Sequence, residues 1–234
     1  MNITELSQKL RDFRKESEAQ KEINRTDKAL VNLKKFANRY PFREKPTEIQ
    51  NLKPKEIFNP NQGDEDYFFY WIQYSLKALG HIFVGHAGWL ENARDDSELF
   101  KKLLEILVNE NKSIAEKLDA PWEKIKGFGG DKHLAKKILF CYYPEKLFPI
   151  YKTEDLEDFM KEFNLPFLRE SENKYNGRYE VLTVGQKFEL LQCMLSNLKK
   201  NIPESKNISK SIFSAFLYHY YPVSRMTKKG KILY

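Results

Sequence analysis

Cysteine and histidine are scarce in this sequence, which limits its metal and disulfide chemistry. The 234 residues include two cysteines, Cys141 and Cys193, and four histidines, at positions 81, 86, 133 and 219. No two Cys or His pairs stand at the spacing of a zinc site, so we expect no metal and no other cofactor. His81 and His86 are better explained by hydrogen bonds to loop backbone. Both cysteines lie in apolar, helix-like stretches and are predicted to be buried, reduced thiols.

Long hydrophobic runs are also missing. No stretch approaches the roughly 20 apolar residues that span a bilayer, and the first sixteen residues, MNITELSQKLRDFRKE, lack the core of a signal peptide. We therefore expect a cytoplasmic protein without a membrane partner. Hydrophobic residues make up 41% of the chain and charged residues 31%, as in a globular protein.

Recognisable catalytic motifs are the third absence. The chain has no Walker motif and no G-x-S-x-G elbow. GFGGDKH, at 127–133, resembles a phosphate loop only weakly, and a structural turn is favoured, with Asp131 as the cap of the following helix. Glu172-Asn-Lys174 has the E-x-K form of some nucleases but lacks their β context. No catalytic residue is assigned, and the chain is not expected to be an enzyme by itself.

The hydrophobic periodicity predicts a mainly α, multi-helix globular domain, with a short β-hairpin or small strands where turns permit them. Residues 1–40 read as a helical pair, the second helix capped by Thr26. Residues 41–63 contain four prolines and are predicted to be a connector without persistent regular structure. Its apolar residues, which would anchor it, are Ile49, Leu52, Ile57 and Phe58.

Residues 64–222 form the predicted main helical domain. It opens with a buried helix that ends at Gly80, followed by an irregular stretch in which residues 82–84 form a short strand or a buried loop. The Asn-Gly pair within 175–179 is typical of a tight hairpin turn. Thr183 and Gln186 form a capping box for a helix through Leu198, and residues 223–234 form a basic tail.

An apolar elbow lies in the middle of this domain, in the stretch KKILFCYYPEKLFPIYKTEDL at 136–156. Pro144 ends one helix, Pro149 stiffens the connection, and Thr153 opens the next helix. The side chains of Leu147, Phe148 and Ile150 can be accommodated only in a core. We therefore predict that the elbow is buried between neighbouring helices.

Positive charge is concentrated at the two ends of the chain. Residues 1–60 carry 14 basic against 9 acidic side chains, and residues 181–234 carry 9 against 2. Such ends attract a polyanion, although solvated helix faces of a lysine-rich chain give the same count. Nucleic-acid binding needs positive charge and exposed aromatic rings. The candidate residues, with simple packing as the alternative for the tryptophan, are Trp89, Lys132, Lys136, Lys137, Arg225, Lys228, Lys229 and Lys231.

Several stretches together resemble the region ahead of the AAA+ motor in McrB-type restriction ATPases. They are DYFFYWIQYSLKALGHIFVGHAG at 66–88, KKILFCYYPEKLFPIYKTEDLEDFM at 136–160, VGQKFELLQCMLSNLK and the closing FLYHYYP. The resemblance covers about residues 64–222, and the elbow is its most specific part. The glycine-rich loop associated with the family is represented only by Gly80, Gly85 and Gly88.

This resemblance implies a DNA-binding specificity module of a restriction or antiviral defence system, one that often reads modified bases. Its implied partners are DNA, an AAA+ motor that hydrolyses GTP or ATP, and a nuclease subunit. Because this chain has no Walker motif, it is expected to be non-catalytic, with KKGKILY as a linker toward a motor. Two alternatives stay open: a protein–protein adaptor for a motor or nuclease subunit, and a metal-dependent nuclease that uses Glu172.

Overall fold

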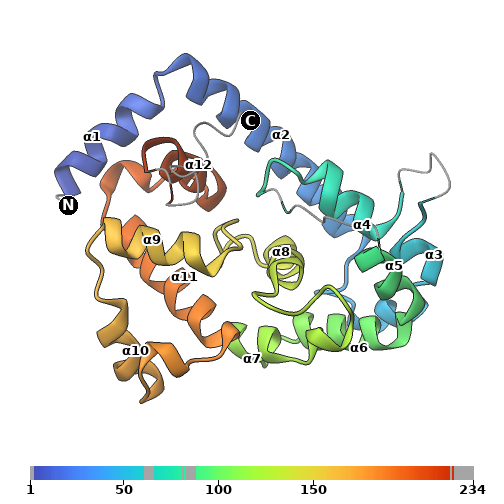
Figure 1. The fold of residues 1–234 in the computed structure, drawn as a ribbon. Helices are drawn as coiled ribbons and strands as arrows, with labels where there is room; N and C mark the ends of the chain where they lie inside the picture. Colours follow the sequence, from blue (N-terminus) through green and yellow to red (C-terminus); the bar gives the residue numbers. More distant parts are fainter. Residues whose placement is uncertain (1–2, 61–65, 81, 83–87, 222, 224–234) are drawn as a thin grey trace.

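The chain folds almost entirely into helices (Figure 1). The computed structural model describes residues 3–60, 66–80, 82, 88–221 and 223, and within these ranges no β-strand occurs. The prediction of a mainly α, multi-helix globular domain is therefore confirmed. Buried residues from the N-terminal pair, the connector and the main segment belong to one hydrophobic cluster.

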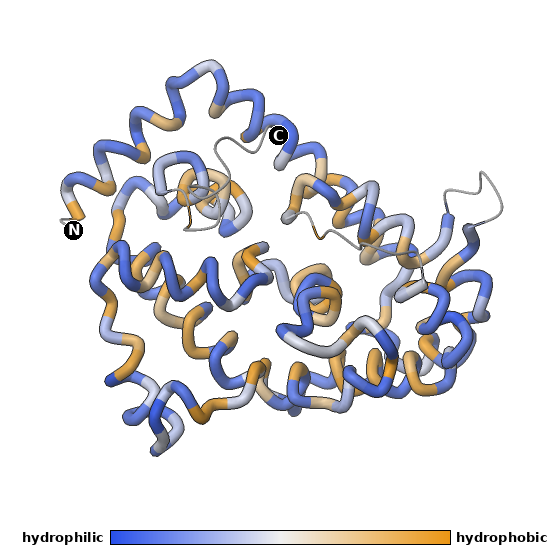
Figure 2. The backbone as a smooth tube through the Cα atoms, in the orientation of Figure 1, coloured by the Kyte–Doolittle hydropathy of each residue, from blue (hydrophilic) through white to orange (hydrophobic). Residues whose placement is uncertain are grey.

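The N-terminal pair consists of α1 (Ile3–Phe13) and α2 (Ser17–Arg39), which run along one edge of the molecule in Figure 1. In Figure 2, α2 alternates between hydrophilic and short hydrophobic stretches, as expected of a helix with one buried stripe. The prediction that Thr26 caps the second helix is wrong. Thr26 lies inside α2 and is buried, because the polar residues before it continue the helix.

The proline-rich connector contains two short helices, η1 (Pro46–Asn51) and α3 (Pro54–Ile57). Both begin at a proline, where the missing N–H costs no helical hydrogen bond. Regular structure thus does occur in this segment, contrary to expectation. The four predicted anchors are all buried: Ile49, Leu52, Ile57 and Phe58.

The predicted long buried helix before Gly80 is shorter and irregular. A brief α4 (Phe68–Tyr70) leads into a π-helical turn, η2 (Trp71–Ser75), and the chain reaches Gly80 through further turns. Ile82 belongs to no helix or strand, and the rest of the predicted strand lies outside the described residues. Then follow α5 (Gly88–Asp95) and α6 (Ser97–Val108).

The next helices are α7 (Ile114–Asp119), η3 (Trp122–Lys124) and α8 (His133–Tyr142). The prediction that Asp131 caps α8 is wrong. The cap position belongs to Lys132, in the left-handed region with φ of 53°, and its side chain makes no capping bond. The Asp131 carboxylate instead accepts a hydrogen bond from the Thr153 backbone N–H, 2.8 Å away, at the start of α9 (Thr153–Glu162).

The elbow between α8 and α9 is buried, as predicted. Leu147, Phe148 and Ile150 have no exposed surface. The side chain of Gln192, from α11 (Val184–Lys200), supplies hydrogen-bond partners for the elbow backbone. The Phe148 N–H donates to Gln192 Oε1 at 2.7 Å, and Gln192 Nε2 donates to Phe148 O at 3.1 Å and to Ile150 O at 3.4 Å. The elbow is therefore fixed to α11 by paired polar contacts inside an apolar core.

The Asn-Gly pair ends a helix and forms no hairpin. α10 (Phe167–Tyr175) finishes at Asn176, whose φ of 52° stops the helix while its N–H still bonds Glu172 O at 2.9 Å. A short η4 (Tyr179–Val181) follows. Asn tolerates this left-handed conformation better than most residues, so the same pair that favours a hairpin turn can also terminate a helix.

The C-terminal elements are α11, η5 (Pro203–Ser205) and α12 (Lys210–Tyr220). The predicted capping box is confirmed, because the Thr183 hydroxyl accepts from Gln186 N and the Gln186 side chain accepts from Thr183 N. α11 contacts α7, α9, α10 and η5 and is the central helix of this half of the fold. Gly185 permits the close approach to α7, since a Cβ there would lie 2.3 Å from Ala115 O.

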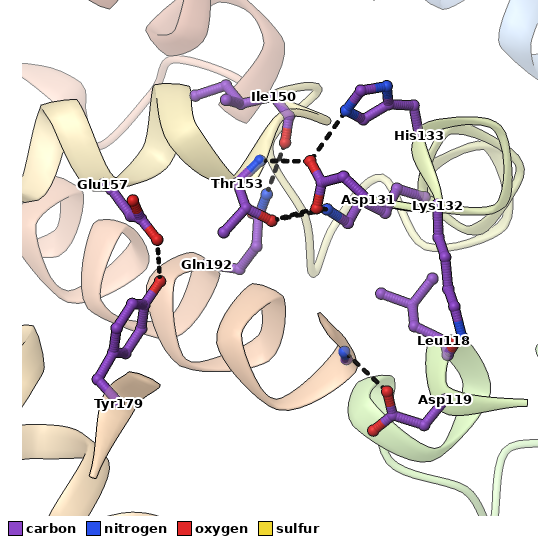
Figure 3. A network of polar contacts seen from close by, with 12 residues as sticks. Leu118, Asp119, Asp131, Lys132, His133, Ile150, Thr153, Glu157, Tyr179 and Gln192 are labelled. Carbon is purple, nitrogen blue, oxygen red and sulfur yellow. Dashed lines mark hydrogen bonds and ion pairs between the residues drawn. The ribbon is translucent and has the colours of Figure 1, made fainter. Parts of the chain in front are cut away.

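Asp131 forms a charged clamp between α8 and α9 (Figure 3). Its carboxylate accepts from Lys136 Nζ and from Thr153 Oγ1, each at 2.5 Å, and lies 2.9 Å from His133 Nε2. Burial opposes the charge of Asp131, but the His133 contact and the Lys136 charge outweigh it and hold the pKa of the carboxyl well below its usual range. Burial lowers the pKa of Lys136 to about 8 despite the carboxylate. The fold therefore contains an ion pair whose cation has no exposed surface.

Substitution Asp131→Asn should lower the free energy of unfolding, measured by urea denaturation, by roughly 3 kcal/mol, because it leaves the Lys136 ammonium buried without a counter-charge. Adding Lys136→Met should recover at least half of that loss, since the buried charge is then removed as well. If the free energy of unfolding of Asp131→Asn lies within about 0.5 kcal/mol of that of the unmodified protein, as is typical of a surface substitution, the clamp is contradicted.

Candidate functional site

Two of the predicted nucleic-acid-binding lysines lie inside the protein. Lys136 is used by the Asp131 clamp, and Lys137 Nζ donates to Gly80 O at 2.7 Å with 1% of the residue exposed. Burial lowers the pKa of Lys137 to about 8. The prediction that these two side chains contact phosphate is therefore wrong in this structure. On α8, both lysines form hydrogen bonds inside the protein, Lys136 with Asp131 and Thr153 and Lys137 with the Gly80 carbonyl.

Lys132 and Trp89 are also engaged in packing. Lys132 Nζ donates to Leu118 O at 3.0 Å and to Ala120 O at 3.2 Å, at the end of α7. Trp89 is partly buried, and its ring packs against Gly127, where a Cβ would lie 2.2 Å from Trp89 Cγ. Gly127 has a φ of 99°, which also favours glycine. The structure supports the packing alternative for Trp89. Arg225, Lys228, Lys229 and Lys231 lie outside the described residues.

The structure brings a different set of lysines together around a cavity of about 750 Å³. This lysine cavity is bounded by the elbow turn, α10, α11, η5 and α12. Six of its lining side chains are lysines and two are glutamates, a formal excess of four positive charges. The lysines are Lys146, Lys174, Lys199, Lys200, Lys206 and Lys210.

Local structure explains why these lysines converge. Lys146 lies in the polar outer turn of the elbow, and Lys199 and Lys200 lie in the last turn of α11, where cations interact favourably with the helix dipole. Lys206 follows η5, and Lys210 begins α12 after the Ser209 cap. The end of α11, the short connection after it and the first residue of α12 therefore carry four of the six lysines.

Both acidic side chains of the lysine cavity already have partners. Glu145 Oε1 accepts from Arg43 at 2.8 Å. Glu189 accepts from Lys174 Nζ and, through its other oxygen, from the Ala115 N–H at the start of α7, each at 2.7 Å. Lys200 and Lys206 are exposed, and their ammonium groups form no hydrogen bond or ion pair within the described ranges. Glu189 thus compensates Lys174, and Glu110 lies 3.4 Å from Lys146, so within the described ranges the uncompensated charge belongs to the other four lysines of the cavity: Lys199, Lys200, Lys206 and Lys210.

Lys210 is the most constrained cation of the cavity. Its ammonium donates to Lys146 O at 2.6 Å and to Ser196 Oγ at 2.5 Å. Burial, reinforced by the charges of Lys199 and Lys200, lowers the pKa of Lys210 to about 8. Like charges held this close together cost free energy that an anion would relieve.

A second group of cations adjoins the lysine cavity at Lys146. The Tyr143 ring has Lys117 Nζ at 3.8 Å, Arg43 Cζ at 4.4 Å and Lys146 Nζ at 4.8 Å from its centroid. Burial lowers the pKa of Lys117 to about 8. The tyrosine hydroxyl donates to Val108 O at 2.9 Å, so the ring has a fixed position. Glu110 lies 2.6 Å from Arg43 Nε and 3.4 Å from Lys146 Nζ, and Glu145 also bonds Arg43, so carboxylates largely compensate this second group of cations.

The two cysteines differ in environment. Cys141 is buried, and burial raises its pKa to about 12, whereas Cys193 is exposed and lines the lysine cavity. The prediction that both thiols are buried is wrong for Cys193. It lies on α11 next to the buried Gln192, and this position faces the cavity instead of the core.

The structure offers little support for nuclease activity at Glu172, for metal binding or for an apolar contact surface. Glu172 and Lys174 are two positions apart on α10, so their side chains point in different directions. Among the described residues, no three His, Cys, Asp or Glu side chains are placed to hold a metal ion. No helix in those same ranges is long and apolar enough to cross a membrane. The exposed large apolar side chains of the described part are distributed over five elements: Ile3, Val31, Tyr74, Leu168 and Val181.

Comparison of the chain with protein families, with curated proteins and with solved structures finds no match.

Treatment of the native protein with excess N-ethylmaleimide should give one adduct, at Cys193, because Cys141 is buried and its thiol resists ionisation. Mass spectrometry of the intact protein and of its peptides would identify the site. A second adduct should form only after denaturation. Modification of Cys141 in the native protein would contradict the described core.

Proposed function

We propose that this chain is a non-catalytic DNA-binding module and that the lysine cavity contacts the phosphate backbone. One observation carries the proposal: six lysines line a single cavity whose two glutamates already have partners. Lysine ammonium groups bind phosphate as point charges, and the release of counterions from DNA drives such binding.

The uncompensated charge gives the cavity the means to hold phosphate oxygens. An ammonium group has three N–H donors. Lys210 uses two of its donors, and Lys199 uses one, to Ser205 O at 2.6 Å. Donors therefore remain for an anionic ligand. Contacts of this kind position a protein on DNA without reading its sequence.

We assign the module to a McrB-like restriction system on the sequence resemblance alone, with an AAA+ motor and a nuclease subunit as the proposed partners. The adaptor alternative gains no specific support, because the exposed apolar side chains of the described part are scattered. The nuclease alternative loses its pattern-based support, since Glu172 and Lys174 share no face of α10.

The double variant K200Q/K206Q should weaken binding to a labelled DNA duplex by about tenfold at low salt and reduce the slope of log K against log salt by about 2, since two phosphate contacts are lost. Fluorescence anisotropy between about 50 and 200 mM salt measures both quantities.

The matched control is K124Q/K126Q, which removes the same charge from two exposed lysines that do not line the cavity. It should leave the affinity nearly unchanged. Absence of DNA binding by the unmodified protein at low salt, or equal losses in the two double variants, would contradict the proposal.

A further inference from the structure

The lysine cavity is concave, and its shape restricts which part of a nucleic acid can enter it. Side chains from the elbow turn, α10, α11, η5 and α12 surround about 750 Å³, the size of a typical small-ligand site. The phosphates inside a duplex are fixed along a continuous charged cylinder, so they can contact the exposed Lys200 and Lys206 but cannot enter the interior of the cavity one at a time. A strand end can enter, because it has a neighbour on one side only.

The lining argues against a base as the occupant. Single bases held by proteins are stacked on aromatic rings or guanidinium planes. The lysine cavity has no aromatic residue and no arginine in its described lining, and its carbon-rich members are Ile114, Ile202 and Pro203. Aliphatic carbons, many of them in lysine side chains, form the larger part of the lining surface, and its polar groups are mostly ammonium, amide and hydroxyl. These polar groups suit phosphate oxygens, and the described lining offers no flat ring or guanidinium on which a base could stack.

The charge of the cavity favours a dianion over a monoanion. An internal phosphodiester carries one negative charge, whereas a phosphate monoester carries about −1.5 to −2 at neutral pH. Lys199 and Lys200 already disfavour the protonated form of Lys210. A dianion relieves this repulsion more than a diester does. The lining carries an excess of four positive charges, enough for a terminal phosphate and its neighbouring diesters.

We propose that the lysine cavity receives the terminal phosphate monoester of a nucleic-acid strand. This inference rests on the proposed function and deepens it, because it makes the module a reader of phosphorylated strand ends at this site. Neighbouring diesters of the same strand contact the exposed lysines of the cavity, Lys200 and Lys206. A free nucleoside monophosphate supplies the same monoester without those diesters and should bind more weakly.

The test compares three short, otherwise identical single strands, labelled internally, with a 5′-phosphate, a 3′-phosphate or hydroxyl groups at both ends. We expect one phosphorylated strand to bind about tenfold more tightly than the hydroxyl strand, since its end adds a charge of about −1.5 to −2. K200Q/K206Q should abolish that preference, whereas K124Q/K126Q should retain it. The preferred end, 5′ or 3′, follows from which strand binds more tightly.

Cys193 supplies a second readout that needs no substitution. Because this thiol lines the lysine cavity, the preferred strand should slow its reaction with N-ethylmaleimide, and the hydroxyl strand at equal concentration should slow it less. A nucleoside monophosphate should protect Cys193 only at much higher concentration. Protection by the monophosphate at the same concentration as the strand would overturn the assignment to strand ends.

The outcomes separate this inference from the proposed function. If all three strands bind equally and K200Q/K206Q weakens each of them, the cavity binds diesters, and only the inference on strand ends falls. A preference that survives in K200Q/K206Q, or that leaves Cys193 unprotected, places the monoester elsewhere and also overturns the inference. If no strand and no duplex binds at low salt, both the inference and the proposed function fall.

Discussion

The buried elbow has a non-helical backbone inside the core, so its N–H and C=O groups need hydrogen-bond partners that water cannot supply. Gln192 provides these partners for Phe148 and Ile150, and both its amide oxygen and its amide nitrogen are used. Asp131 does the same for the first N–H of α9. Two side chains from outside the elbow thus form hydrogen bonds with backbone groups of the segment on which the surrounding helices pack. The apolar side chains provide burial energy, while these polar contacts fix one arrangement of α8, α9 and α11.

The same arrangement shapes the lysine cavity. Gln192 lines the cavity as well as holding the elbow, and Lys210 at the start of α12 donates to Lys146 O in the elbow turn. The elbow therefore buries its apolar residues and presents Glu145 and Lys146 on its outer side. Gln192 and the outer turn of the elbow both line the cavity, so the position of the lysines depends on the contact between the elbow and α11. This connection explains how uncompensated ammonium groups can be held close together: the fold fixes their backbone before any anion arrives.

Much of the fold was predictable from the sequence, because helical periodicity, prolines and capping residues act locally. The elbow, the Thr183 capping box and the buried anchors of the connector follow from such signals. The failures have non-local causes. The position of Asp131 in the sequence is compatible with capping α8 and with bonding the start of α9, and only the tertiary structure determines which contact forms. Asn176 can start a hairpin or stop a helix, and α10 uses it to stop.

For the candidate site, only a concentration of positive charge toward one end of the chain was predictable from the sequence. The basic excess of residues 181–234 falls on the segment that contributes four of the cavity lysines: Lys199, Lys200, Lys206 and Lys210. The predicted Lys136 and Lys137 are buried instead, because a lysine on a largely apolar helix is as well suited to a buried contact as to an exposed one. Their sequence neighbours, Ile138 to Tyr143, are an apolar run that indicates a buried helix.

Amide hydrogen exchange at Phe148 measures whether Gln192 clamps the elbow to α11. This amide lies outside any helix, yet it should exchange only through global unfolding, with an opening free energy equal to the free energy of unfolding of the whole protein. Exchange of Phe148 at the rate of an exposed loop amide would contradict this clamping, because the elbow would then open independently of α11.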